Sequence, residues 1–238
     1  MKYLNVIIQV SRNMSDNSIK KIGLSLLVTV VMLLGACENA VPEVEAEFTV
    51  TIRNLFTQGP PMVLSEGVFY THEDGFPLFF TSSMDYGEGL ELLAEDGIAD
   101  QLLTSLEKNK YVNVAGDFID ILPGESVSFK FTAKYGEFFN LATMFTASND
   151  AFYSFDEEGI FLFEADGTPL NGDITTKIWL WDAGTEQNEP PFEGVNQPTN
   201  PPMIDAGVET MEGVRLLVDD RFPGKNEVIQ VLIEGRKL

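Results

Sequence analysis

The chain has 238 residues and carries 37 Asp and Glu against 15 Lys and Arg, a formal net charge of −22. A surface this acidic repels phosphate backbones, which argues against nucleic acid as a partner. The sequence contains one cysteine and one histidine, so it offers neither a disulfide framework nor the several ligands that zinc sites draw from Cys and His.

The N-terminal part of the sequence predicts export. An apolar run, residues 22–34, follows two lysines and leads into the small residues before Cys37. The run is too short for a permanent membrane span, which needs roughly 20 residues. We expect Cys37 to be acylated as the first residue of a mature bacterial lipoprotein; the alternative is an ordinary secretory signal with an incidental cysteine. Translation starts at Met1 or Met14, and Met14 would give a signal of ordinary length.

This processing site predicts the organisation of the chain. A signal peptide spans 1–36, an acidic, proline-containing tether spans 37–46, and one domain spans 47–238. The mature part has 11 Lys and Arg against 36 Asp and Glu. We therefore expect an acidic protein of the cell envelope, held to the membrane through the Cys37 lipid. The residue after Cys37 is Glu38, and Asp at that position would favour retention in the inner membrane. Its absence indicates the outer membrane if the host has two membranes.

Most predicted elements of the domain are strands. Apolar and polar residues alternate, with β-branched residues enriched, and this pattern is typical of half-buried strands. The clearest segments are 48–53, 126–133, 173–181 and 227–235, with shorter candidates at 62–70, 140–146 and 214–218, and a strand entering the core at 74–80. The segment 186–202 holds five of the twelve prolines of the chain, which predicts a surface loop.

One segment has helical rather than strand periodicity. In residues 88–108, apolar side chains recur at intervals of three and four, and Asp96-Gly97 interrupts them, which predicts two short helices or one broken helix. Many short strands, frequent Gly and Pro turns and little helix predict an all-β fold, an antiparallel β-sandwich of about eight strands.

Two acidic turns are candidate cation sites. "WDAGTE" (181–186) places Asp182 and Glu186 around a flexible glycine, and "TASNDAF" (146–152) adds Asp150 with neighbouring amide and hydroxyl groups. Calcium takes six to eight oxygen ligands of these kinds. Turns of this composition are also the ordinary way to leave a strand. By strand periodicity Trp179 and Trp181 share one face, which predicts that both belong to the core; the alternative is an exposed platform on which a sugar stacks.

Catalysis finds less support in the sequence. His72 is the only histidine, and no Gly-x-Ser-x-Gly elbow, Walker loop or dinucleotide fingerprint occurs. We interpret His72, near a turn and beside aromatic and acidic residues, as a structural hydrogen-bonding group. A pair of carboxylates could still hydrolyse glycosides, although no spacing singles out one pair.

The two acidic turns also carry a resemblance to a known family. "NLATMFTASNDAF" (140–152), "FEADGTPL" (163–170) and "WDAGTEQN" (181–188) resemble the F-spondin amino-terminal domain in its bacterial secreted form, and "GLELLAEDG" (89–97) and "ILPGESVSFKF" (121–131) are similar to it as well. The resemblance spans about residues 47–220. It implies an eight-stranded antiparallel sandwich similar to calcium-dependent lipid-binding domains. It also implies one calcium ion, as in the animal members, and a role in adhesion or binding.

Carried over position by position, the resemblance implies Asp150, Asp182 and Glu186 as calcium ligands. Animal members have Asp where this chain has Glu186, which reaches one methylene further and can still chelate. We therefore expect a lipid-anchored, extracytoplasmic, calcium-binding module that is non-catalytic and recognises an extracellular protein, glycan or lipid. The alternatives are a carboxylate-based hydrolase of surface glycans and a purely structural envelope lipoprotein.

Overall fold

The computed structural model describes residues 43–73, 76–84, 87–198 and 206–238. The predicted signal peptide, the lipidation site Cys37 and most of the predicted tether lie outside the described residues. The first strand begins at Glu45, two residues before the predicted start of the domain. Within the described residues, no helix is long and apolar enough to cross a bilayer.

Two antiparallel sheets form a sandwich, which confirms the predicted all-β fold. The smaller sheet has the strand order β4 (Ser126–Lys134), β1 (Glu45–Asn54), β11 (Ile229–Lys237), β8 (Asn171–Asp173). The larger sheet has the order β10 (Arg215–Leu216), β9 (Trp179–Asp182), β6 (Ala151–Ser154), β5 (Phe138–Phe145), β2 (Leu64–His72), β3 (Val112–Phe118), with β7 (Ile160–Phe161) also paired to β5.

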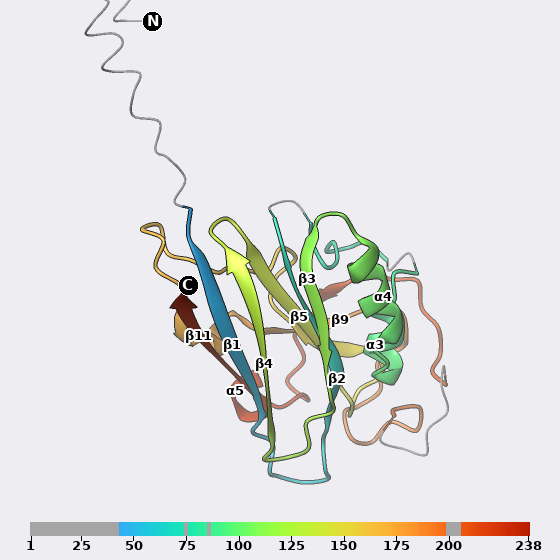
Figure 1. Ribbon diagram of the computed structural model, residues 1–238. Helices are drawn as coiled ribbons and strands as arrows, with labels where there is room; N and C mark the ends of the chain where they lie inside the picture. The colour runs from blue at the N-terminus through green and yellow to red at the C-terminus, as the bar shows by residue number, and fades with distance from the viewer. Residues whose placement is uncertain (1–42, 74–75, 85–86, 199–205) are drawn as a thin grey trace, which may run out of the picture. The chain divides into compact units, whose positions relative to one another are not determined.

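Short helices complete the fold. These are α3 (Leu90–Asp96), α4 (Asp100–Lys108), the 3-10 helix η1 (Thr175–Lys177) and α5 (Lys225–Val228). Figure 1 shows α3 and α4 beside the larger sheet, on the side away from the smaller sheet. The two helices predicted in 88–108 are thus confirmed, and α3 ends at Gly97 with a φ of 71°, a left-handed conformation that glycine adopts readily.

Apolar side chains form two separate cores. The first core lies between the two sheets and includes Phe48, Ile52 and Phe139, all fully buried. The second lies between the helices and the larger sheet and includes Leu93 and Phe152. A sheet with apolar residues on both faces needs a cover on each, and α3 and α4 supply the second cover.

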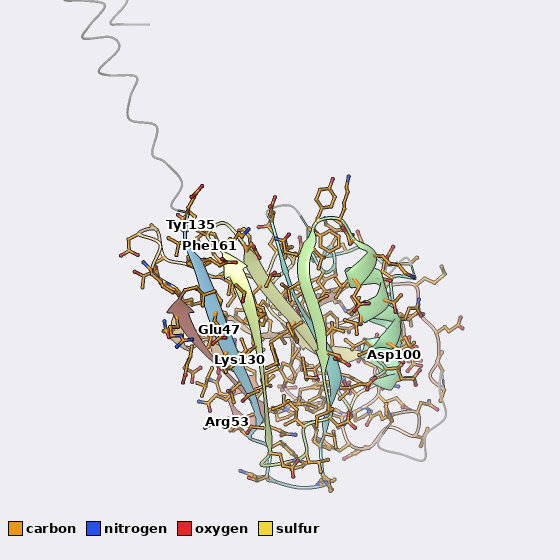
Figure 2. All side chains as sticks on the ribbon, in the orientation of Figure 1. Glu47, Arg53, Asp100, Lys130, Tyr135 and Phe161 are labelled. Atoms are coloured by element: carbon orange, nitrogen blue, oxygen red, sulfur yellow. The ribbon has the colours of Figure 1, made fainter. Side chains whose placement is uncertain are left out.

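The alternation predicted in the first strand is present in β1. Phe48, Val50 and Ile52 face the inner core and the residues between them face outward. On the outer face, Lys130 of β4 lies beside Glu47 of β1, with their Nζ and Oε1 atoms 3.3 Å apart (Figure 2). The pair is exposed to solvent, so it contributes little to stability.

The predicted continuous strand at 173–181 is wrong. The segment forms β8, then η1, then β9, and the first and last of these belong to different sheets. The chain therefore crosses from one sheet to the other at this point. Trp181 is buried as predicted, but Trp179 is 43% exposed, and the Lys225 ammonium lies 3.8 Å from its ring centroid.

The predicted strand at 74–80 is also wrong, because its described part, from Phe76 onward, is irregular. In contrast, β3 went unpredicted, since Ala115 and Gly116 interrupt its apolar pattern. A Cβ at Gly116 would lie 2.6 Å from Cζ of Phe69 on the paired strand. The ring therefore packs over the bare glycine, a pairing that sequence alternation does not reveal.

The inner core generates a stability prediction. Phe139 is fully buried and stacks on Phe131 with ring centroids 5.1 Å apart. We expect Phe139→Ala to lower the free energy of unfolding by about 3–5 kcal/mol. The matched control Phe80→Ala removes a ring that is 59% exposed, and a change within about 1 kcal/mol is expected. Urea denaturation measures both, and equal losses would contradict the assignment of the core.

Candidate functional site

The pairing of β6 with β9 positions the two acidic turns. The strands are antiparallel, with Ala151 opposite Asp182. Asp150 immediately precedes β6 and Asp182 is the last residue of β9, so both lie at the same end of the larger sheet. The Ala183 N–H also donates to the Asp150 carbonyl at 3.0 Å.

Gly184 shapes the turn that follows β9. Its φ is 74°, and a Cβ there would lie 2.6 Å from the carbonyl oxygen of Glu212. Both the left-handed conformation and the close backbone neighbour require glycine. The turn brings the N–H groups of Thr185 and Glu186 toward Asp150.

Asp150 is the central carboxylate of the site. Its side chain is fully buried, and its Oδ2 accepts hydrogen bonds from the N–H groups of Thr185 at 2.9 Å and Glu186 at 3.1 Å. The other oxygen, Oδ1, is buried without a hydrogen-bond partner. Leaving a buried carboxylate oxygen unsatisfied is costly, so this atom requires an explanation.

Asp182, also fully buried, has partners on both oxygens. Oδ1 accepts from the Gly184 N–H at 2.8 Å, and Oδ2 accepts from the Asn188 amide at 2.5 Å and the Arg215 guanidinium at 2.8 Å. Arg215, on β10, also pairs with Glu212. Its guanidinium therefore brings a positive charge to this end of the sheet.

Glu186 is the third predicted ligand and is almost fully buried. Its Oε1 accepts from the Gly207 N–H at 2.7 Å, and its Oε2 from the Asn149 amide at 3.3 Å. The structure thus brings Asp150, Asp182 and Glu186 to one place from two separate turns.

Glu95 is a member of the cluster that the sequence analysis missed. It lies on α3 and is buried, and it interacts electrostatically with both Asp150 and Glu186. Nothing in the helical pattern marks it, because only the packing of α3 against the larger sheet decides where it points. Arg215 was missed as well, although it is the first basic residue after Lys177 in a long acidic stretch.

Burial and mutual repulsion disfavour the ionised forms of two of these carboxyls. Burial, followed by repulsion from Asp182, raises the pKa of Asp150 from 3.8 to about 6, although the N–H groups that it accepts oppose the shift. The pKa of Glu95 is raised from 4.5 to about 7, mainly by burial and also by Glu186 and Asp150, while the Thr185 hydroxyl opposes the shift.

The donor set of the site consists of oxygen atoms. Four carboxylates (Glu95, Asp150, Asp182 and Glu186) make up the cluster, and the guanidinium of Arg215, which pairs with Asp182, is shared with Glu212. Oxygen ligands of this kind suit a hard cation such as calcium. Among the residues that the structure describes, no group of three or more Asp, Glu, His or Cys side chains is already arranged around a metal position. A bound cation would therefore require side chains to reorient.

His72 lies apart from this cluster. It is the last residue of β2, whereas Leu64, which pairs with Phe145, is the first. Its ring is buried, stacks on Tyr70 and Phe138, and has its two nitrogens 2.7 and 2.8 Å from the carbonyls of Glu73 and Glu158. These contacts fit the structural hydrogen-bonding role that we expected of this residue.

Comparison with known proteins adds no family assignment. No protein-family model matches the chain, and no curated protein matches it.

The raised pKa values predict how stability depends on pH in metal-free buffer. A folded-state pKa above the unfolded value means that protonation favours the folded protein, so stability falls as pH rises from about 4 toward 7. For Asp150, whose pKa moves from 3.8 to about 6, the loss is about 3 kcal/mol. Urea denaturation at pH 5 and pH 7 measures the part of this loss that falls between the two, about 1 kcal/mol, and Asp150→Asn should flatten the slope. An equal slope in that variant would contradict the assignment.

Proposed function

We propose that this protein is a lipid-anchored, extracytoplasmic module that binds calcium at the acidic end of its β-sandwich and serves in adhesion or ligand binding. The buried Oδ1 of Asp150 carries the proposal, because it has no hydrogen-bond partner and lies among three further carboxylates. A divalent cation would supply the missing partner and neutralise two of the negative charges.

The surrounding groups support a hard cation over other ligands. Asp150 Oδ2 is held by two backbone N–H groups, which fixes the carboxylate and leaves its Oδ1 available. Asp182 Oδ1 and Glu186 accept hydrogen bonds, and a carboxylate oxygen with two lone pairs can accept one bond and coordinate a metal with the other. Asp182 Oδ2 already accepts two hydrogen bonds. Thr185 adds a neighbouring hydroxyl.

The cluster lies at the end of the sandwich opposite the start of β1. Glu45 begins β1, and the cluster lies near the other end of that strand. Just after β1, Phe56 stacks on Phe192. The Phe192 N–H donates to the carbonyl of Ala147, which belongs to the same turn as Asp150. Ten residues of strand span about 33 Å. The cluster therefore lies near the opposite end of the described domain from Glu45.

Burial of the carboxylates favours a binding role over glycan hydrolysis. Asp150 and Asp182 are fully buried, and Glu186 is 4% exposed. A glycosidase needs its two carboxylates on either side of the scissile bond, in contact with the sugar. A polymer could not reach these side chains without displacing the turns that cover them, whereas a cation could.

The calcium site is tested by isothermal titration of calcium into the purified full chain. We expect one calcium per chain, and at least about a tenfold loss of affinity in Asp150→Asn, because a buried carboxylate ligand is removed. The matched control Glu107→Gln removes one charge from an exposed position on α4, and its affinity should be unchanged. No binding at millimolar calcium, or equal binding by Asp150→Asn, would rule the site out.

Arg215 provides a second test of the same site. Its guanidinium occupies one oxygen of Asp182 and repels an incoming cation. We expect Arg215→Gln to bind calcium about tenfold more tightly, since a nearby positive charge is removed. Calcium titration of this variant beside the wild type measures the change. Weaker binding would show that Arg215 supports the site instead of competing with the metal.

The lipid anchor is tested separately by replacing the predicted acylation residue. We expect Cys37→Ala to release the protein from the membrane fraction and to abolish incorporation of a labelled fatty acid, because a thiol is needed for attachment. Fractionation and mass spectrometry of the mature N-terminus measure both. Unchanged membrane association would instead favour an ordinary secretory signal with a different means of retention.

A further inference from the structure

Asn188 brings a buried carbonyl oxygen to the acidic cluster. Its Nδ2 donates to Oδ2 of Asp182 at 2.5 Å, which places the amide against one of the candidate calcium ligands. Its Oδ1 is buried and, among the residues that the structure describes, has no hydrogen-bond partner. Asp150 Oδ1 is in the same position. A buried acceptor without a partner is costly, so this second oxygen also requires an explanation.

The backbone on both sides of Asn188 is held in place. The N–H of Gln187 donates to the carbonyl of Val208 at 2.8 Å. The N–H of Glu189 donates to Oδ1 of Asn149, in the first acidic turn, at 3.0 Å. Asn188 is thus fixed beside the cluster before any ion binds, and only its side chain would have to move. A ligand held in advance in this way does not add the cost of ordering a loop to the binding step.

Turning the Asn188 amide by half a revolution exchanges its two ends. One end is an NH2 group that donates and the other is a carbonyl oxygen that accepts, and the two have nearly the same shape. The turn would break the bond from Nδ2 to Asp182, while Oδ1 has no partner in the described residues to lose. A cation on Oδ2 of Asp182 would repel the NH2 end and attract the oxygen end. A bound cation therefore favours the reversed amide.

A neutral oxygen ligand suits a site that already gathers several carboxylates. Asp150 and Asp182 repel each other electrostatically, and Glu186 adds to the repulsion on Asp150. Calcium takes six to eight oxygen ligands, and amide oxygens are among those that it accepts. A further carboxylate would raise the coordination number at the cost of more repulsion, whereas an amide oxygen raises it without adding charge.

We propose that Asn188 is a neutral calcium ligand, whose amide turns so that Oδ1 joins Asp150, Asp182 and Glu186 around the ion. The inference rests on the calcium site proposed above and extends its ligand set beyond the carboxylates. In the metal-free protein the NH2 end of the amide holds Asp182. When calcium enters, the oxygen end binds the ion and that hydrogen bond is given up.

The first test removes the amide oxygen. Calcium chloride is titrated by calorimetry into the full chain, and Asn188→Leu, which keeps the size of the side chain but has no oxygen, should bind about tenfold more weakly than the wild type. The matched control Gln187→Leu makes the same change at the neighbouring exposed residue, and its affinity should be unchanged. Equal affinity in Asn188→Leu and the wild type would overturn the inference.

Asn188→Asp separates a ligand from a group that merely positions Asp182. This variant keeps an oxygen donor but loses the NH2 group, so it should bind calcium at least as tightly as the wild type. Its melting temperature in chelator should fall, because a new carboxylate then faces Asp182, and the rise caused by calcium should be at least as large as in the wild type. A tenfold loss of affinity would show that the NH2 group matters and would overturn the inference. The same variant decides the matter if Asn188→Leu fails to fold.

The wild-type titration distinguishes this inference from the proposed function on which it rests. If the wild type binds no calcium, the calcium site itself is ruled out, and the role of Asn188 with it. If the wild type binds calcium and Asn188→Leu binds it equally well, the site stands and only the role of Asn188 is overturned.

Discussion

The candidate cation site depends on one feature, the antiparallel pairing of β6 with β9. Because Ala151 lies opposite Asp182, two turns distant in sequence meet at one end of the larger sheet. Asp150, Asp182 and Glu186 are thereby gathered where water is largely excluded, and the packing of α3 adds Glu95. Strand pairing supplies the free energy that holds these like charges together, and the raised pKa values of Asp150 and Glu95 are the electrostatic consequence.

The acidic cluster shares its elements with a mainly apolar cavity of about 210 Å³, which is lined by segment 76–84, α3 and α4. On α3, Leu90 lines the cavity and Glu95 belongs to the cluster. On β9, Trp181 packs against the cavity wall through Phe79, and the next residue is Asp182. The helices that cover the second face of the larger sheet therefore border both. A shift of α3 would move residues of both the cluster and the cavity.

The sequence predicted those parts of the fold where one face of a segment is apolar. The alternation in β1 and β4 and the helical spacing in α3 and α4 survive in the structure, because each of these elements buries a single face against one core. Prediction failed where burial follows another pattern. β6 is buried on both faces and is only four residues long, and β3 depends on the ring of Phe69 lying over Gly116. Such features depend on neighbours that no local pattern contains.

The sequence by itself determined the all-β class, the two short helices and the two acidic turns, because periodicity and turn composition are local properties. It also singled out Asp150, Asp182 and Glu186, which the structure places together. Tertiary structure alone decided that Glu95 and Arg215 join them, that Trp179 is exposed, and that segment 76–84 lines a cavity instead of forming a strand. Each of these outcomes depends on which distant surface packs against a residue, and that is settled only when the sheets and helices assemble.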